Sequence, residues 1–214
     1  MDNRHDILQL LRQVAEGAVP PEEALSQLKR QPFEDLGYAK VDLHRGVRQG
    51  AAEVIYGAGK TPEQIAGIAG AMGERGCRNV LITRLSPEAA ELVAETVPLD
   101  YHPIPRLAVA YPGERKALGH IVVATGGTSD MPVAEEAALT AEVLGNRVTR
   151  LYDVGVAGLH RLLANLEPLM SARCVVAVAG MEGALASVVG GLVDCPVVAV
   201  PTSVGYGASF GGLS

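Results

Sequence analysis

The sequence predicts an α/β protein whose C-terminal half is a parallel β-sheet with helices on both faces. From His120 onward, apolar runs alternate with helix-like segments: IVVATGG, 131–145, RVTRLYD, about 155–165, CVVAVAG, about 182–192 and PVVAVP. The runs are short and continuous, as in strands that are buried on both faces. Such sheets bind ligands beyond the carboxyl ends of their strands, so the candidate functional loops are 125–130, 152–158, 180–183 and 201–214.

The beginning of the chain predicts smaller elements. Residues 5–30 predict two short helices, because apolar residues recur at helical spacing on both sides of an interruption at Pro20 and Pro21. The segment FEDLGYAKVDLHRGVRQG, residues 33–50, predicts loop and short strand. The next run, EVIY, predicts a further strand.

A helix with a clear start signal follows. Thr61 is a suitable cap, Pro62 suits the first helical position, and Gln64 completes a capping box, so we expect a helix to about Gly76. A strand at 79–83, a helix opened by Ser86-Pro87 and a strand at 106–110 come next. The segment YPGERKALG predicts the boundary between a helical and small α/β region, 1–115, and a larger-sheet domain, 116–214.

Composition narrows the class of protein. The 214 residues are 48% hydrophobic and 20% charged, which is typical of a globular chain with a substantial core. The 18 basic and 24 acidic residues give a net charge of -6, and the basic ones are scattered, so we expect no nucleic-acid partner. Three cysteines without C-x-x-C spacing fit a reducing compartment, and we expect a cytoplasmic protein.

The sequence also argues against a membrane partner. The N-terminus, MDNRHDILQLL, is too polar for a signal peptide. Residues 174–193 are apolar enough to resemble a membrane span, but their glycines and the central Glu182 favour a buried strand, turn and helix.

The first candidate loop is TGGTSD. An apolar strand, a glycine turn and a helix N-terminus follow each other there, an order that leaves free backbone N–H groups for an anion such as phosphate. Ser129 or Asp130 can cap the helix. A tight turn with a capped helix explains the loop equally well, so both interpretations stay open for its residues: Gly126, Gly127, Thr128, Ser129 and Asp130.

The second and third loops add polar groups. Asp153 directly follows an apolar strand, with Gly155 in the turn and His160 in the next helix, where a histidine is more often a surface or packing residue. Glu182, after Gly180 and Met181, is the sole ionisable residue of AGMEGALASVVGG. As a structural residue it would be a carboxylate in the first helical turn, stabilised by the helix dipole. As a functional residue it would lie between apolar walls, where desolvation raises its pKa toward that of a general base.

Other motifs carry less weight. GAGKT at 57–61 lacks the first glycine of a nucleotide P-loop, and Phe210 breaks the dinucleotide fingerprint that GYG at 205–207 begins. The histidines are dispersed, so we expect no metal site. In KVDLHRGVRQG, Lys40 and Arg45 belong either to a solvated edge strand or to a cationic lip that contacts a ligand phosphate.

Four long strings together resemble the LarB family, the pyridinium-3,5-biscarboxylic acid mononucleotide synthases of nickel-pincer cofactor biosynthesis. The resemblance covers nearly the whole chain. The strings are LGYAKVDLHRGVRQGAAEVIYGAGKTPEQI, TGGTSDMPVAEEAALTAEVLGNRV, RLYDVGVAGLHRLL and AGMEGALASVVGGLVDCPVVAVPTSVGYGASFGG.

The C-terminal half is also similar to the PurE-type phosphoribosylaminoimidazole carboxylases. This similarity implies a flavodoxin-like, three-layer parallel sheet, a homo-oligomer (octamer or tetramer), and a phosphate and ribose loop matched here by Ser129 and Asp130. The match breaks where those enzymes carry a histidine, since the aligned residue is Ala186, and Glu182 stands where they have glycine. An aminoimidazole ribotide carboxylase or mutase and a non-catalytic dinucleotide-binding protein are the alternatives.

Membership of the LarB family would imply a reaction of nicotinic acid adenine dinucleotide with CO2 that carboxylates C5 of the pyridinium ring and releases AMP. A cysteine thiolate would add to C4, and Glu182 is the candidate base for the C5 proton. No tightly bound cofactor is expected, although the reaction leaves room for Mg²⁺. The family's cysteine follows the GYGASFGGLS-type segment, so we expect it beyond Ser214 and expect the 214-residue chain to be inactive.

Overall fold

The chain forms two compact units, Met1–Gly113 and Glu114–Ser214. The computed structural model describes residues 3–29, 33–42, 45, 53–115 and 117–204. The division falls within the YPGERKALG segment, where the sequence predicts a boundary. Within the described ranges, no helix has the length and apolar character that crossing a membrane requires.

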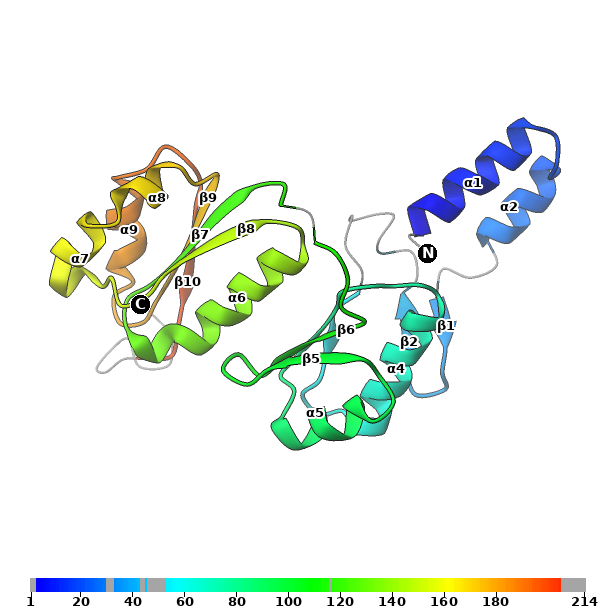
Figure 1. The fold of residues 1–214 in the computed structure, drawn as a ribbon, viewed down its shortest axis with the longest axis horizontal. Coiled ribbons are helices and arrows are strands. Elements are labelled where there is room, and N and C mark those ends of the chain that lie inside the picture. The colour runs from blue at the N-terminus through cyan, green and yellow to red at the C-terminus, as the bar shows by residue number, and fades with distance from the viewer. Residues whose placement is uncertain (1–2, 30–32, 43–44, 46–52, 116, 205–214) are drawn as a thin grey trace. The chain divides into compact units, whose positions relative to one another are not determined.

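Unit 2, Glu114–Ser214, is built on a four-stranded parallel sheet (Figure 1). Its strands are β7 (His120–Thr125), β8 (Arg147–Leu151), β9 (Cys174–Ala179) and β10 (Val197–Pro201). They lie in the order β10-β9-β7-β8, and all neighbours are parallel. Numbered within the unit this order is 2-1-3-4, the order of flavodoxin-like sheets, so the predicted fold class is confirmed.

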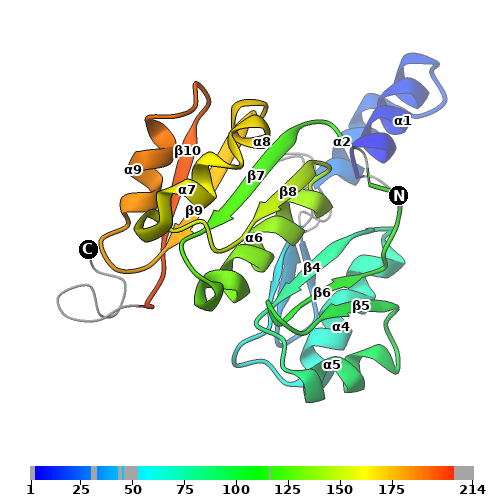
Figure 2. The ribbon, with the colours of Figure 1, turned by 60° about the vertical axis from the view of Figure 1, so that its left-hand side comes forward.

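Helices cover both faces of this sheet. Helix α6 (Met131–Val143) packs on one face, and α7 (Leu159–Leu163), α8 (Leu166–Met170) and α9 (Ala184–Gly190) pack on the other (Figure 2). Along β7, Val122 and Ala124 join the three-helix side while Val123 joins α6, and all three are inaccessible to solvent. Because both faces are covered, the strands are continuously apolar.

Two predicted helices differ from the observed ones. The helix expected over 155–165 is a 3₁₀ turn, Val156–Gly158, followed by α7 and α8. Pro168 explains the break between α7 and α8, because proline has no N–H to donate and its ring would clash with the carbonyl of Ala164 in a continuous helix. Helix α9 begins at Ala184 rather than at 182, since Met181 and Gly183 have left-handed backbone conformations (φ 55° and 65°).

Unit 1, Met1–Gly113, contains a second four-stranded sheet in the order β3-β4-β6-β5. The strands are β3 (Ile55–Tyr56), β4 (Val80–Thr83), β5 (Leu99–His102) and β6 (Leu107–Ala110). β4 is parallel to β3 and antiparallel to β6. Strand β5 was not predicted, because LDYH is short, polar in part and enclosed between Pro98 and Pro103.

Unit 1 also contains two helices that pack on its sheet and two small hairpins. Helices α4 (Pro62–Glu74) and α5 (Pro87–Ala94) share an apolar core with the sheet. The predicted capping box is present, since the Gln64 N–H donates to the Thr61 hydroxyl and the Thr61 N–H to the Gln64 side chain. The hairpins are the antiparallel pair β1 (Phe33–Asp35) and β2 (Lys40–Asp42), and the helices α1 (Asn3–Ala15) and α2 (Pro21–Lys29).

Candidate functional site

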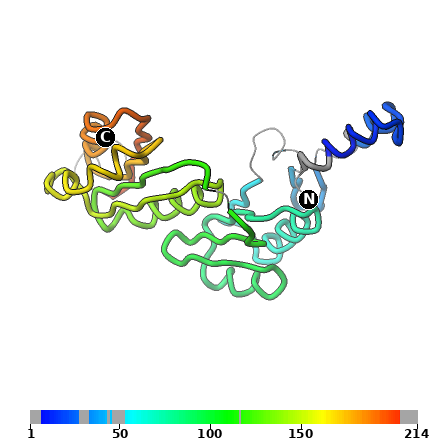
Figure 3. Tube along the Cα trace, turned by 45° about the horizontal axis from the view of Figure 1, so that its top comes forward, coloured from blue at the N-terminus to red at the C-terminus, as the bar shows by residue number. Residues whose placement is uncertain are grey.

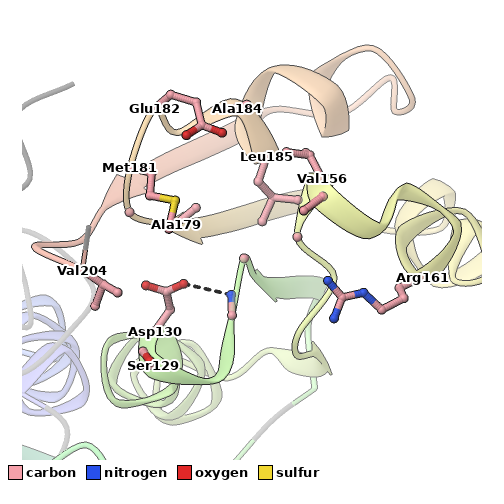
Figure 4. A pocket seen from close by; sticks show the side chains of 15 residues that line it. Ser129, Asp130, Val156, Arg161, Ala179, Met181, Glu182, Ala184, Leu185 and Val204 are labelled. Atoms are coloured by element: carbon pink, nitrogen blue, oxygen red, sulfur yellow. Dashed lines mark hydrogen bonds between the residues drawn. The ribbon is translucent and has the colours of Figure 1, made fainter. Parts of the chain in front are cut away.

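A pocket of about 280 Å³ lies at the carboxyl ends of β7 and β9 (Figure 4). The connection from β7 to β8 runs through α6 on one face of the sheet, and the connection from β8 to β9 runs through helices on the other face. The loops therefore diverge between β7 and β9, which is where open α/β sheets bind their ligands. The lining residues belong to the segments 126–130, 155–161 and 179–185, together with Val204.

Asp130 organises the first loop. Its carboxylate is buried and accepts two hydrogen bonds, from the Gly127 N–H (3.0 Å) and from the Thr202 hydroxyl (2.7 Å). These bonds fix the glycine turn and tie it to the residue that follows β10. The expected capping of α6 by Ser129 or Asp130 was wrong, because α6 has no side-chain cap and the Asp130 oxygens are used elsewhere.

The second loop is bonded to the first. The Asp153 N–H donates to the Thr125 hydroxyl, and Asp153 has a left-handed backbone conformation (φ 57°). A β-carbon on Gly155 would lie 2.4 Å from the Gly126 carbonyl oxygen, so only glycine allows this approach. The Asp153 carboxylate forms an ion pair with Arg161 at 2.5 Å, and Arg161 lines the pocket.

The third loop contains the candidate base. A β-carbon on Gly180 would lie 1.7 Å from the Val204 carbonyl oxygen, and the Met181 N–H donates to that same oxygen. Glu182 follows, at the edge of the pocket opposite Ser129 and Asp130 (Figure 4). The expected burial of Glu182 between apolar walls was wrong, because its residue is exposed and lies in the turn before α9.

The predicted site residues do not all meet at this pocket. Thr128 lies in the 3₁₀ turn Thr128–Asp130, and Asp153 reaches the pocket through Arg161. His160 is exposed on α7 and is not a lining residue. The predicted residues that line the pocket are Gly126, Gly127, Ser129, Asp130, Gly155, Gly180, Met181 and Glu182.

Lys40 and Arg45 belong to unit 1 and are not among the described lining residues. The Lys40 ammonium lies 3.9 Å from Asp35 and 5.3 Å from the centre of the Phe33 ring. These contacts fit the solvated strand that was one of its two interpretations. The part of the fourth loop at 205–214, including GYG, lies outside the described residues.

Sequence reasoning missed two polar residues of this site. Arg161 supplies the positive charge of the lining, and Thr202 holds Asp130. Arg161 is the neighbour of His160 in the sequence. Only its position around the helix places its side chain, and not that of His160, at the pocket. Thr202 is a polar residue directly after an apolar strand, and this position in the sequence could have identified it as a site residue.

Metal and thiol ligands are not gathered at this pocket. In the described part of the chain, no three His, Cys, Asp or Glu residues are grouped so that they could hold a metal ion. None of the three cysteines lines the pocket. Cys174 begins β9, at the opposite end of the sheet, where burial and the nearby Cys195 raise the pKa of its thiol and so favour the unreactive form.

The pocket's chemistry combines one cation, two carboxylates and an apolar wall. The cation is Arg161, which is paired with Asp153, and the apolar surface comes from Val156, Met181, Leu185 and Val204. The fold and the pocket define a flavodoxin-like domain with a ligand site at its switch point. Comparison with known families gives its class: residues 120–212 match the AIR carboxylase family, and residues 33–112 match the LarB/PurE-like N-terminal domain.

The same domain pair identifies the family. An uncharacterized protein of Methanocaldococcus jannaschii is 35% identical over 208 residues, which cover 92% of this chain and 81% of that protein. The chain belongs to the LarB-like family, in which a LarB/PurE-like N-terminal domain precedes an AIR carboxylase domain. This membership supports a carboxylase-type enzyme.

Replacing Gly155 by alanine is expected to lower the free energy of unfolding by about 1–3 kcal/mol, because the new methyl group overlaps the Gly126 carbonyl. Urea unfolding measures the change. Gly127→Ala is the matched control from the neighbouring loop, since its β-carbon would meet nothing within 4 Å, and its effect is expected to stay within about 0.5 kcal/mol. Equal effects of the two substitutions would contradict the close approach of the loops.

Proposed function

We propose that this chain is the carboxylase and hydrolase that converts nicotinic acid adenine dinucleotide and CO2 to pyridinium-3,5-biscarboxylic acid mononucleotide and AMP, in nickel-pincer cofactor biosynthesis. The observation that carries the proposal is the pocket at the β7–β9 switch point, which is lined by the Arg161 guanidinium, the Glu182 carboxylate and apolar side chains. The family membership supports the carboxylase class.

The anion side would hold the nucleotide's ribose phosphate. The Gly126 and Gly127 N–H groups already donate to the Val178 carbonyl and the Asp130 carboxylate. The groups that would contact the phosphate are therefore the Ser129 hydroxyl and the Arg161 guanidinium, which is suited to paired hydrogen bonds with phosphate oxygens. Asp130 is buried and each of its carboxylate oxygens already accepts a hydrogen bond within the protein, so we assign it mainly to holding the loop. Asp153 keeps Arg161 in place until a phosphate competes for it.

The chemical step requires an activated ring, because a pyridinium carbon is a poor nucleophile toward CO2. A thiolate adds to C4, so that C5 becomes an enamine carbon and forms a bond to the carbon of CO2. Glu182 then takes the C5 proton, and the thiolate leaves C4 as the ring regains aromaticity. Water cleaves the phosphoanhydride of the dinucleotide and AMP departs.

The thiolate of this scheme would come from a cysteine after the GYGASFGGLS-type segment, as in the family that the sequence resembles. The described residues do not form a metal-binding group, so no step is assigned to Mg²⁺. We also propose a homo-oligomer, an octamer or a tetramer, by similarity to the PurE-type enzymes.

The second candidate is an aminoimidazole ribotide carboxylase or mutase, which the AIR carboxylase match favours. Ala186 opposes it, because the carboxylases carry a histidine there. Calorimetric titration with both compounds decides between the candidates: binding of the dinucleotide alone supports the pyridine-nucleotide reaction, and binding of the ribotide alone supports the second candidate.

Arg161→Gln is expected to weaken binding of nicotinic acid mononucleotide by roughly 10- to 100-fold, since a hydrogen bond to a charged group contributes about 1.5–3 kcal/mol. Calorimetry measures the affinity, and circular dichroism verifies that the variant is folded. Arg173→Gln is the control, because Arg173 is exposed next to the start of β9, away from the pocket. Unchanged affinity in Arg161→Gln would remove Arg161 from the phosphate site.

Glu182→Gln in the full gene product is expected to lower the carboxylation rate by about 10²- to 10⁴-fold, the usual contribution of a general base. Binding of the dinucleotide should be retained, because the amide keeps the shape of the side chain. Incorporation of radiolabelled bicarbonate measures the rate. Glu167→Gln, in the first turn of α8, is the matched control; a rate unaffected by Glu182→Gln would favour a protein that binds the dinucleotide without catalysis.

A polypeptide of residues 1–214 is expected to bind nicotinic acid adenine dinucleotide without carboxylating it, because Cys77, Cys174 and Cys195 do not line the pocket. The same bicarbonate assay and a calorimetric titration give the two measurements. Sustained incorporation of label by this polypeptide would show that the thiolate mechanism does not apply.

A further inference from the structure

The helical hairpin of α1 and α2 lies outside the two regions that match known families, 33–112 and 120–212. The two helices pack side by side and run in opposite directions, joined by the turn at 16–20 (Figure 3). Among the described elements, each makes its substantial contacts with the other. At 13 and 9 residues both are short for helices that are stable alone, so further apolar burial would stabilise them.

Helix α1 has two adjacent apolar stripes. Ile7, Leu10 and Val14 follow the helical spacing i, i+3, i+7 and are partly buried, on the side where α2 packs with its buried Ala24. The second stripe repeats this spacing one residue later, at Leu8, Leu11 and Ala15. A helix with such a wide apolar surface contacts more than one neighbour.

The second stripe is exposed. Leu8 is 46% exposed and Leu11 is 50% exposed, and Leu25 of α2 is 51% exposed. We call these three leucines the outer stripe. They contrast with the strand residues of the core of unit 1, such as Val80 and Ile82, which are inaccessible to solvent.

The hairpin's charges are divided between its two ends. The end with the turn is mainly acidic, and its charged residues are Arg12, Glu16, Glu22 and Glu23. At the open end, where α1 starts and α2 ends, the sequence has three basic residues, Arg4, Lys29 and Arg30, and two acidic ones, Asp2 and Asp6. A hairpin with an excess of acidic residues at one end and of basic residues at the other is complementary to a second copy of itself in the opposite orientation.

We propose that the outer stripe docks against the outer stripe of a second copy of this chain, so that two hairpins form an antiparallel four-helix bundle. A two-fold axis brings the same surface of each copy together, and here it also brings each acidic end beside a basic end. Burial of the leucines supplies the attraction, and the charges set the orientation. This interface is independent of the chemistry at the pocket.

Cross-linking of cysteine variants of the whole chain tests the interface. Leu11→Cys and Leu8→Cys are expected to give covalent dimers with a short bismaleimide on a denaturing gel. Gln9→Cys is the matched control, because Gln9 is exposed on the same helix but lies away from the stripe. The unsubstituted chain controls for the three native cysteines. Equal dimer yields from Leu11→Cys and Gln9→Cys, or no dimer from either leucine position, would overturn the proposal.

Charge reversal tests the orientation. In the Leu11→Cys background, Glu22→Lys with Glu23→Lys should lower the dimer yield severalfold, and adding Arg4→Glu with Lys29→Glu should restore it. A yield insensitive to these changes would overturn the antiparallel arrangement. Two results would show another occupant, and either would overturn the proposal. A Leu8→Glu, Leu11→Glu chain that keeps the assembly mass of the unsubstituted protein in sedimentation but melts at a lower temperature would indicate packing within one chain. Flotation of the unsubstituted protein with anionic vesicles would indicate a membrane surface.

Discussion

Backbone segments approach each other at the carboxyl ends of β7 and β9 more closely than side chains would allow. Gly155 lies against the Gly126 carbonyl, and Gly180 against the Val204 carbonyl. Without these contacts the loops would separate, and the residues they carry would no longer face one cavity. Gly155 and Gly180 are therefore required by the packing between loops. Their backbone freedom is secondary, because neither has a positive φ.

The same region stores conformational strain in residues other than glycine. Asp153 and Met181 both adopt left-handed conformations, which cost free energy in residues with a β-carbon. Each is held by hydrogen bonds to a neighbouring segment: the Asp153 N–H bonds to Thr125, and the Met181 N–H bonds to Val204. Strained residues held in this way cluster at ligand sites, which agrees with the position of the pocket.

A second set of contacts supports these loops from behind. Arg150, in β8, bonds to Glu135 and Glu142 of α6, and the Tyr152 hydroxyl donates to Glu135. Burial and the neighbouring carboxylate raise the pKa of Tyr152, so its hydroxyl stays a donor further into alkaline solution than that of an exposed tyrosine. The network joins α6, which starts directly after Asp130, to β8, which ends shortly before Asp153, and so it supports two loops of the pocket.

The sequence predicted the parts of the structure that depend on local patterns. Continuous apolar strands and the Thr61 capping box identified the parallel sheet and the start of α4, because burial on two faces and helix capping leave marks in a few neighbouring residues. Strand β5 escaped prediction, since its pairing with β6 is non-local and LDYH has no strong strand pattern. For the site, the sequence identified the loops that line the pocket. It did not show which side chains of those loops point into the pocket, so His160 was chosen in place of Arg161.

Glu182 shows how far such local reasoning extends. Its glycine-rich surroundings suggested a buried base, whereas the described structure places it in an exposed turn at the edge of the pocket. Exposure is compatible with the proposed role if the ligand supplies the burial. A pyridinium ring resting on Met181 and Leu185 would displace water from the carboxylate, and a desolvated carboxylate takes up a proton more readily. On this view the ligand itself completes the environment of the base, and Glu182 becomes effective only when a ring lies beside it.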